Sequence, residues 1–183
     1  TTASAEIEKF QDFAEPDNHS KSFGLSSANA LELPFADNTF DKVICSEVLE
    51  HIPDYQGALA EIWRITKPGG RIGISVPHRW PEQICWLFSE EYHNTPGGHV
   101  RIFRKKDLRA DFETLGFRFV RSHLKHGLHS PYWWLRCAIG VNNDRNILVR
   151  AYKKLLEIEI LKNPLPLRLA SAMADPLMGK SVV

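Results

Sequence analysis

The sequence predicts an α/β fold with a mostly parallel sheet. Residues 41–45 and 71–76 form two short apolar runs, a pattern typical of strands buried on both faces. Residues 54–66, which lie between them, place apolar side chains at helical spacing. A helix of this kind is the crossover that joins two parallel strands of one sheet. We therefore expect the two strands to be parallel neighbours, with the helix packed across them.

The other elements follow from local pattern. Asp54 is placed to cap the crossover helix, and residues 67–70 (Lys-Pro-Gly-Gly) end it, because Pro and Gly break helices. Residues 117–122 alternate apolar side chains with arginine, which predicts a strand near a sheet edge. Apolar spacing also predicts a helix over 5–14, a weak strand over 21–27, and helices over 81–88, 106–115, 145–162 and 165–177.

The amino-acid composition limits which binding partners and which cellular compartment are expected for the protein. The 183 residues suit one domain, and a formal net charge of +1 gives no electrostatic argument for a nucleic-acid partner. Cys45, Cys85 and Cys137 are widely spaced and form no metal or disulfide pattern, so a reducing cytoplasm is expected. The apolar run 131–141 is too short to span a bilayer and contains Arg136, so no transmembrane segment is expected.

Polar side chains follow both predicted strands. Ser46 and Glu47 come directly after the first strand, and His78 comes shortly after the second. Ligands in open α/β sheets bind beyond the carboxyl ends of the strands, so these residues are candidates for a binding site. The alternative for Ser46 and Glu47 is a helix cap followed by a first-turn carboxylate.

Two longer strings carry a resemblance to a known family. Residues 30–52 read ALELPFADNTFDKVICSEVLEHI, and residues 67–77 read KPGGRIGISVP. Together with the string GHVRIF at 98–103, they closely resemble class I S-adenosylmethionine-dependent methyltransferases of the group that acts on small molecules and lipids. The resemblance implies an incomplete Rossmann-like sheet, with the family strand order 3-2-1-4-5-7-6. It divides the chain into a partial methyltransferase core, 1–123, and a helical insertion or lid, 124–183, that leads into the last strand.

The resemblance also implies where S-adenosylmethionine binds. Asn29 stands where the family usually has an acidic residue, so it would accept from the adenine amino group without charge assistance. Gly69 and Gly70 are expected to be structural. The resemblance implies that the adenine lies against Asn29, Ala30 and Leu31. It implies that the methionine side of the cofactor lies against Cys45, Ser46 and Glu47.

The family's glycine-rich loop after the first strand has no counterpart in the sequence. The sequence opens inside a predicted helix and closes on a β-branched run at 181–183, so we expect both ends to interrupt longer elements. On that basis we expect weak binding of S-adenosylmethionine by this segment. Two other functions stay open, a non-catalytic methyltransferase-like interaction module and a nicotinamide enzyme, although the latter's glycine fingerprint is also missing.

Methyl transfer depends mainly on proximity and orientation, and it needs a base only if the acceptor must lose a proton. His51, His93 and His99 are the candidate catalytic residues, because imidazole titrates near neutral pH. The alternatives are a helical His51 that bonds the backbone and a solvated loop that holds the other two. A second group of histidines, at 123, 126 and 129, has no assured shared face, so we expect no metal site.

The expected acceptor is a small molecule, lipid-like or aromatic, and the sequence leaves the oligomeric state open. Residues 132–134 (Tyr-Trp-Trp) are adjacent aromatics and cannot all face one side of a helix, so at least one is free to line an acceptor pocket. The alternative is a core helix that buries all three. The predicted acceptor-binding residues combine aromatic side chains with one arginine: Trp86, Tyr92, Arg101, Trp133 and Trp134.

Overall fold

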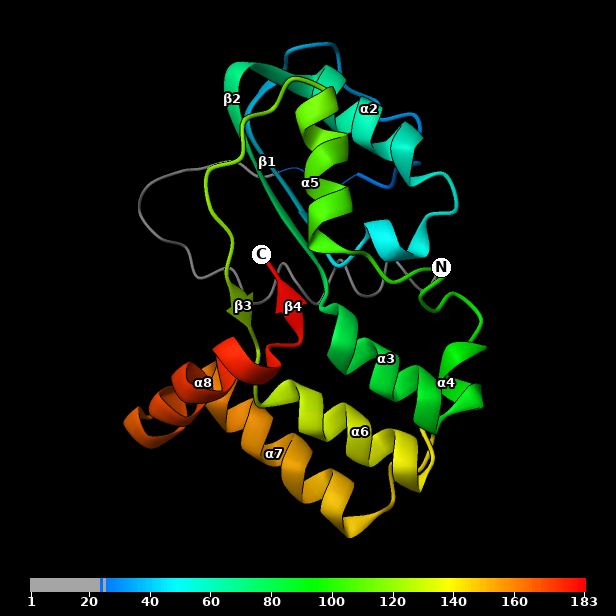
Figure 1. The fold of residues 1–183 in the computed structure, drawn as a ribbon, viewed down its shortest axis with the longest axis vertical. Helices are drawn as coiled ribbons and strands as arrows, with labels where there is room; N and C mark the ends of the chain where they lie inside the picture. The colour runs from blue at the N-terminus through cyan, green and yellow to red at the C-terminus, as the bar shows by residue number, and fades with distance from the viewer. Residues whose placement is uncertain (1–23, 25) are drawn as a thin grey trace.

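The computed structural model describes residues 24 and 26–183. Figure 1 shows a small sheet that carries two helices on one face and ends on a layer of further helices. The predicted helix over 5–14 and most of the predicted strand over 21–27 lie outside the described residues. The elements in chain order are β1 (Phe40–Ser46), η1 (Leu49–His51), α2 (Tyr55–Ile65), β2 (Thr66–Pro77), α3 (Arg79–Phe88), α4 (Glu90–His93), α5 (Lys105–Thr114), β3 (Leu124–Lys125), α6 (His129–Ile139), α7 (Ile147–Lys162), α8 (Leu165–Met178) and β4 (Ser181–Val182).

The sheet has the strand order β1-β2-β4-β3. β1 and β2 are parallel, with Val43 opposite Ile72 and Cys45 opposite Ile74, which confirms the predicted pair. β4 is antiparallel to both β2 and β3, so β1, β2 and β3 run in one direction and β4 alone is reversed. The α/β fold class is therefore confirmed, and the order agrees with the 4-5-7-6 portion of the expected sheet.

Residues 67–70, which were predicted to end the crossover helix, lie inside β2 as an irregularity of the ladder. Phe40 pairs with Thr66 while Lys42 pairs with Arg71, so residues 67–70 bulge out of β2 opposite Asp41. Gly69 supplies the positive φ of 78° that this excursion needs. Lys67 forms an ion pair with Asp41 at 2.9 Å across the bulge.

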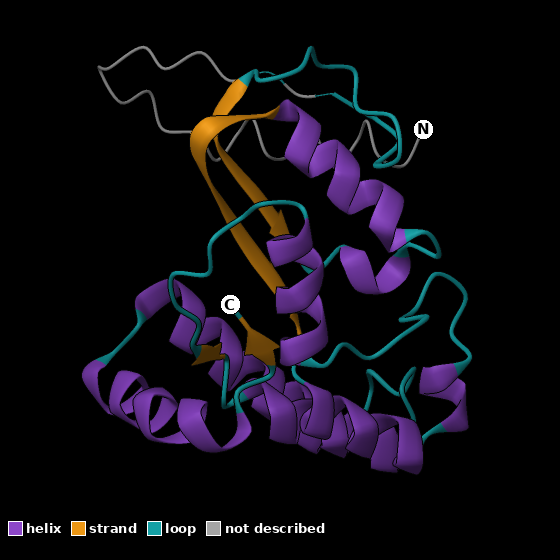
Figure 2. Ribbon diagram, turned by 45° about the horizontal axis from the view of Figure 1, so that its top comes forward, coloured by secondary structure: helices purple, strands orange, loops and turns teal. Residues whose placement is uncertain are grey.

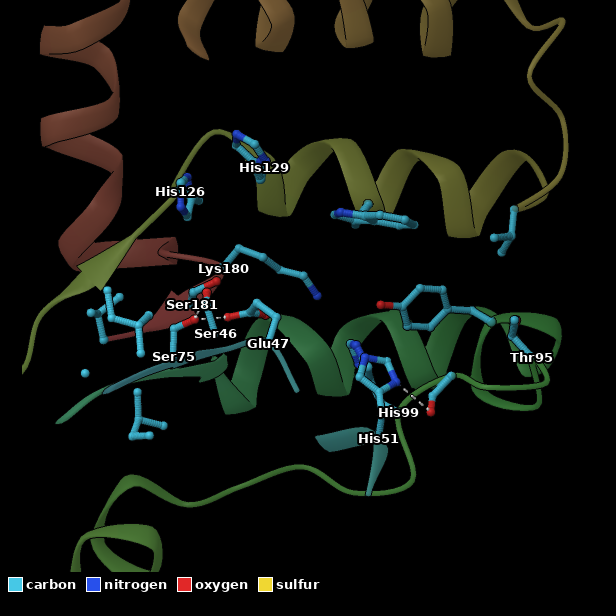
Figure 3. Close-up of a pocket in the computed structure, with 18 residues that line it drawn as sticks. Ser46, Glu47, His51, Ser75, Thr95, His99, His126, His129, Lys180 and Ser181 are labelled. Atoms are coloured by element: carbon cyan, nitrogen blue, oxygen red, sulfur yellow. Dashed lines mark hydrogen bonds between the residues drawn. The ribbon is translucent and has the colours of Figure 1, made fainter. Parts of the chain in front are cut away.

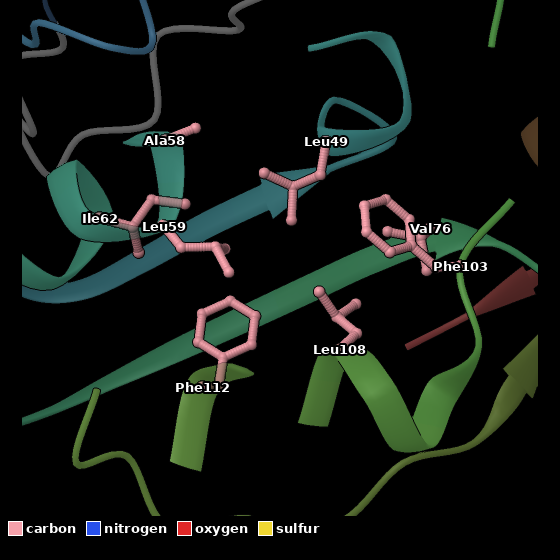
Figure 4. Close-up of a cluster of buried hydrophobic side chains, with 8 residues drawn as sticks. All are labelled: Leu49, Ala58, Leu59, Ile62, Val76, Phe103, Leu108 and Phe112. Carbon is pink, nitrogen blue, oxygen red and sulfur yellow. The ribbon is translucent and has the colours of Figure 1, made fainter. Parts of the chain in front are cut away.

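The main core lies between the sheet and the two helices α2 and α5 (Figure 4). Asp54 caps α2 as predicted, accepting from the Gly57 backbone N–H at 3.0 Å. Leu59 of α2, Phe112 of α5 and Val76 of β2 are buried members of this one cluster. Full burial of an aliphatic or aromatic side chain stabilises by about 1.5–3 kcal/mol, so this cluster fixes the position of both strands.

The predicted edge strand over 117–122 is wrong. These residues form a loop, and the short strand β3 begins later, at Leu124. A strand needs a neighbour for its ladder, and no described strand pairs with residues 117–122. Phe119, which the alternating pattern assigned to the sheet, instead lies under the Arg109 guanidinium at 4.4 Å from its ring centre.

The helical layer lies beyond the carboxyl ends of β1 and β2 (Figures 1 and 2). α6 and α7 share a second, smaller core built on Tyr132, Val149 and Leu156. α6 also packs against α3, so the expected core and the expected insertion are in direct contact across the proposed boundary at residue 123. Among the described helices, none combines the length and apolar character that crossing a membrane requires.

Candidate functional site

A cavity of about 670 Å³ opens where the strands meet the helical layer. Its walls come from the carboxyl ends of β1 and β2, the loop after α4, the start of α6, and β4 (Figure 3). Side chains alternate along β1, so Ile44 and Ser46 face the cavity while Val43 and Cys45 face the main core. This is the position at which ligands bind in open α/β sheets.

Three polar side chains are joined at the strand ends. The hydroxyls of Ser46 and Ser75 are 2.8 Å apart, and Ser75 Oγ donates to Glu47 Oε1 at 2.8 Å. Glu47 has a left-handed backbone, with φ at 52°, held by its N–H donating to the Ser75 carbonyl at 2.9 Å. The helix-cap alternative for Ser46 and Glu47 is therefore wrong: both side chains line the cavity and bond to the neighbouring strand.

The other four residues expected at the cofactor lie away from the cavity. Cys45 packs toward the core, where burial, followed by the charge of Glu50, raises its thiol pKa to about 11. Asn29 Oδ1 accepts from the backbone N–H of Leu31 at 3.1 Å, so this acceptor is engaged within its own turn. Ala30 packs against the main core and Leu31 is exposed. The adenine pocket at these residues remains a prediction.

Two of the three candidate catalytic histidines lie side by side in the cavity wall. The rings of His51 and His99 are 4.9 Å apart and meet edge to face. His51 Nδ1 lies 2.9 Å from the carbonyl of Gly97 and 3.1 Å from that of Gly98, which is the backbone-bonding role held open for it. His99 Nδ1 lies 2.5 Å from Glu82 Oε1.

Glu82 is a fully buried glutamate with three side-chain partners, and the sequence did not indicate it. Besides His99, its carboxylate binds the ammonium of Lys180 and accepts from Tyr92 Oη at 3.4 Å. Burial alone would raise the pKa of Glu82, but the His99 hydrogen bond and the Lys180 charge lower it to about 2. A glutamate in the first turn of a helix is commonly explained by its favourable interaction with the helix dipole. Lys180 is far away in the chain, so no local sequence pattern predicts that the two residues form an ion pair.

Three of the predicted site residues have other roles. His93 stacks on Trp86 with ring centres 4.1 Å apart, and neither residue lines the cavity. The Arg101 guanidinium donates to the carbonyls of Leu49, Ile52 and Pro53. Arg101 therefore anchors the backbone that follows η1 and does not line the cavity either.

The three adjacent aromatics have three different environments. Tyr132 is buried in the second core. Trp133 lines the cavity beside Tyr92, with ring centres 5.6 Å apart. Trp134 turns toward α3, where it packs on Trp80 and donates to the Pro81 carbonyl at 3.1 Å. Trp133 and Tyr92 thus form an aromatic wall, and Trp134 has a structural position.

A buried carboxylate lies beside the two cavity histidines. Glu50 is completely buried, and neither of its oxygens has a hydrogen-bond partner among the described residues. Burial raises the pKa of this carboxyl. Glu50, His51 and His99 each offer one ligand atom, and these atoms lie within 4.8 Å of one another. The sequence alone predicted no metal site and did not indicate Glu50 as a ligand.

Comparisons with known proteins agree with this architecture. Residues 3–74 match the family model described as a methyltransferase domain. An uncharacterized protein of Methanocaldococcus jannaschii is 42% identical over 57% of this chain and 42% of its own length. A sterol 24-C-methyltransferase of Aspergillus fumigatus is 32% identical over 53% of this chain and 23% of its own. A demethylmenaquinone methyltransferase of Bacillus cereus is 48% identical over 28% of this chain and 22% of its own. The chain spans less than half the length of each of these relatives.

Solved structures share the fold at lower identity. A protein from Galdieria sulphuraria described as a sarcosine dimethylglycine methyltransferase aligns over 84% of this chain and 57% of its own, with a TM-score of 0.54 and 17% identity. A protein from Bacillus halodurans described as a methyltransferase aligns over 92% of this chain and 66% of its own, with a TM-score of 0.51 and 20% identity. The chain therefore has the Rossmann-like fold of the class I, S-adenosylmethionine-dependent methyltransferases, and its residues 3–74 match their methyltransferase domain.

Proposed function

We propose that the protein carrying this sequence transfers the methyl group of S-adenosylmethionine to a small, hydrophobic, ring-bearing acceptor. The observation that carries the proposal is the cavity itself. One end presents the linked Ser46, Ser75 and Glu47, and the side toward α6 presents the aromatic wall of Tyr92 and Trp133. A polar end and an apolar wall suit a charged cofactor and an apolar acceptor held face to face.

The polar end fits the methionine part of the cofactor. The sulfonium and the α-ammonium are both cationic, and the Glu47 carboxylate attracts them at the carboxyl ends of the strands. Ser46 and Ser75 add hydroxyl groups that donate or accept. The adenine and ribose require further contacts, and Asn29, Ala30 and Leu31 are proposed for the adenine from the family resemblance alone.

Transfer requires the acceptor nucleophile to approach the sulfonium methyl in line with the carbon–sulfur bond. The new bond forms at the methyl carbon while the sulfur leaves with the electron pair of the old bond, so positioning supplies most of the rate enhancement. His51 and His99 keep Nε2 without a hydrogen-bond partner among the described residues, so either can take a proton from an acceptor that must lose one.

The acceptor class has two supports. The aromatic wall favours rings and apolar surface over sugars or amino acids. Two of the relatives reported above are named for a sterol and for demethylmenaquinone, which are apolar ring compounds. We propose an acceptor of the same chemical class for this chain.

A radiolabel assay tests the proposal. The protein that carries this sequence is incubated with methyl-labelled S-adenosylmethionine and with a sterol, a naphthoquinol, a sugar and an amino acid in parallel. We expect label in the organic phase with one of the ring compounds. Glu47→Gln should weaken cofactor binding about 10-fold, the equivalent of roughly 1.4 kcal/mol. Label transferred only to the polar acceptors would reject the acceptor class, and cofactor binding without any transfer would favour the non-catalytic alternative.

A further inference from the structure

Glu50 differs from the other buried glutamate near the cavity. Glu82 is equally buried, and Lys180, His99 and Tyr92 all contact its carboxylate. Glu50 accepts no hydrogen bond among the described residues, and its closest basic group is His51 Nε2, 3.8 Å from Oε1. An ionised carboxylate without partners is costly to bury, so a cation bound beside Glu50 would stabilise its charged form.

His51 and His99 are oriented to supply nitrogen atoms at the same point. Nδ1 of His51 faces the carbonyls of Gly97 and Gly98, and Nδ1 of His99 faces the Glu82 carboxylate. Carbonyl and carboxylate oxygens only accept, so Nδ1 carries the proton in both rings and each Nε2 keeps a lone pair. Metal-binding histidines have this arrangement, with the far nitrogen donating to a carbonyl or a carboxylate.

We propose that Glu50, His51 and His99 bind one divalent first-row transition cation such as Zn²⁺ or Co²⁺. The three ligand atoms lie within 4.8 Å of one another. Atoms bound to one ion at ~2.1 Å stand up to ~4.2 Å apart, so small side-chain rotations complete the site. Two imidazoles and one carboxylate suit these ions better than Ca²⁺ or Mg²⁺, which take oxygen ligands.

The position of the site indicates what the ion does. His51 and His99 line the cavity (Figure 3), whereas Glu50 is fully buried and does not line it, so an ion held by all three would lie at the cavity wall. With the ion bound, the Nε2 atoms of His51 and His99 are ligands rather than bases, and the ion itself lowers the pKa of a bound hydroxyl. If the cavity holds the acceptor, as proposed above, this inference narrows the acceptor to a ring compound that carries a hydroxyl group. Metal binding itself does not depend on that proposed function.

Metal titration tests the site directly. The protein that carries this sequence is stripped with a chelator and titrated without cofactor, with Zn²⁺ by calorimetry and with Co²⁺ by visible absorption. We expect one equivalent to bind. Glu50→Gln and His51→Asn should each weaken binding at least ~100-fold, and Glu82→Gln, which alters the partner of His99, about 10–100-fold. His126→Asn is the matched control, because His126 lines the same cavity outside the cluster and should leave the affinity unchanged.

Thermal unfolding separates binding from folding. Glu50→Gln removes a buried charge, so the metal-free variant should unfold at the same temperature as the metal-free parent or higher. Zn²⁺ should raise the unfolding temperature of the parent and not that of the variant. No binding by the parent, or equal affinity in Glu50→Gln, would overturn the inference. Zinc binding at this site without methyl transfer to any acceptor would reject the proposed function and leave the metal site standing.

Discussion

The sheet with its two helices and the helical layer beyond it are held by different interactions. In α2, Ala58 and Leu59 are each only 1% exposed, because β1, β2 and α5 cover them. In α7 and α8, Leu161 is 82% and Met173 is 75% exposed. The helical layer and the strand ends are also joined by a buried charge pair, Lys180 with Glu82. Amphipathic helices thus become core elements only where a partner surface covers them.

The largest expected effect is at the charged contact between the two regions. Glu82→Ala should lower the free energy of unfolding by about 3–5 kcal/mol, because it leaves the buried ammonium of Lys180 without a partner. Chemical denaturation of the parent and the variant measures the change. Combining Glu82→Ala with Lys180→Met should recover much of the loss; if the double variant is as unstable as the single one, the charge pair is not the cause.

The next effect contrasts apolar residues from the two regions. Leu59→Ala should cost about 2–5 kcal/mol, because it opens a cavity in the main core. Leu161→Ala, a matched leucine on α7, should change stability by no more than ~0.5 kcal/mol. Equal losses in urea denaturation would show that the exposed face of α7 is covered in solution, and the contrast between the two regions would fail.

The adjacent tryptophans of α6 allow the cavity and a helix–helix contact to be compared within one turn of helix. Trp133→Ala should raise the acceptor KM with no change in cofactor affinity, since Trp133 lines the cavity. Trp134→Ala should instead lower stability by about 3 kcal/mol, since Trp134 packs on Trp80 and donates to Pro81. Steady-state kinetics and thermal unfolding of both variants check the assignment, which a raised KM in Trp134→Ala alone would contradict.

The smallest effect concerns acid stability at the outer edge of the sheet region. Arg64 hydrogen bonds, followed by the Leu33 backbone N–H, lower the pKa of Glu61 to about 2. Because the folded pKa lies below the unfolded value of 4.5, this pairing stabilises the fold above that pH and is lost as pH falls toward 2. Glu61→Gln should flatten the decline of unfolding temperature between pH 4.5 and 2. An unchanged slope would assign the decline to other carboxylates.

The sequence alone was sufficient for the elements whose cause is local. Asp54, the apolar spacing of α2 and the two runs of buried residues predicted a strand–helix–strand unit, and the structure has it. Residues 117–122 had an equally regular alternation and form a loop, because a strand also needs a neighbour and no described strand pairs with them. The sequence at and just after the end of β1 also predicted that Ser46, Glu47 and His51 lie near a binding site. All three line the cavity.

Tertiary structure decided everything that depends on distant partners. Trp133 and Trp134 are neighbours in sequence, and only the packing of α6 on α3 assigns one to the cavity and the other to a helix contact. Glu50 and Glu82 are both glutamates near a helix start. Glu82 forms an ion pair with Lys180, whereas the Glu50 carboxylate has no hydrogen-bond partner among the described residues. Local pattern fixes which face of an element is apolar, whereas the charge around a buried group depends on segments that only folding brings together.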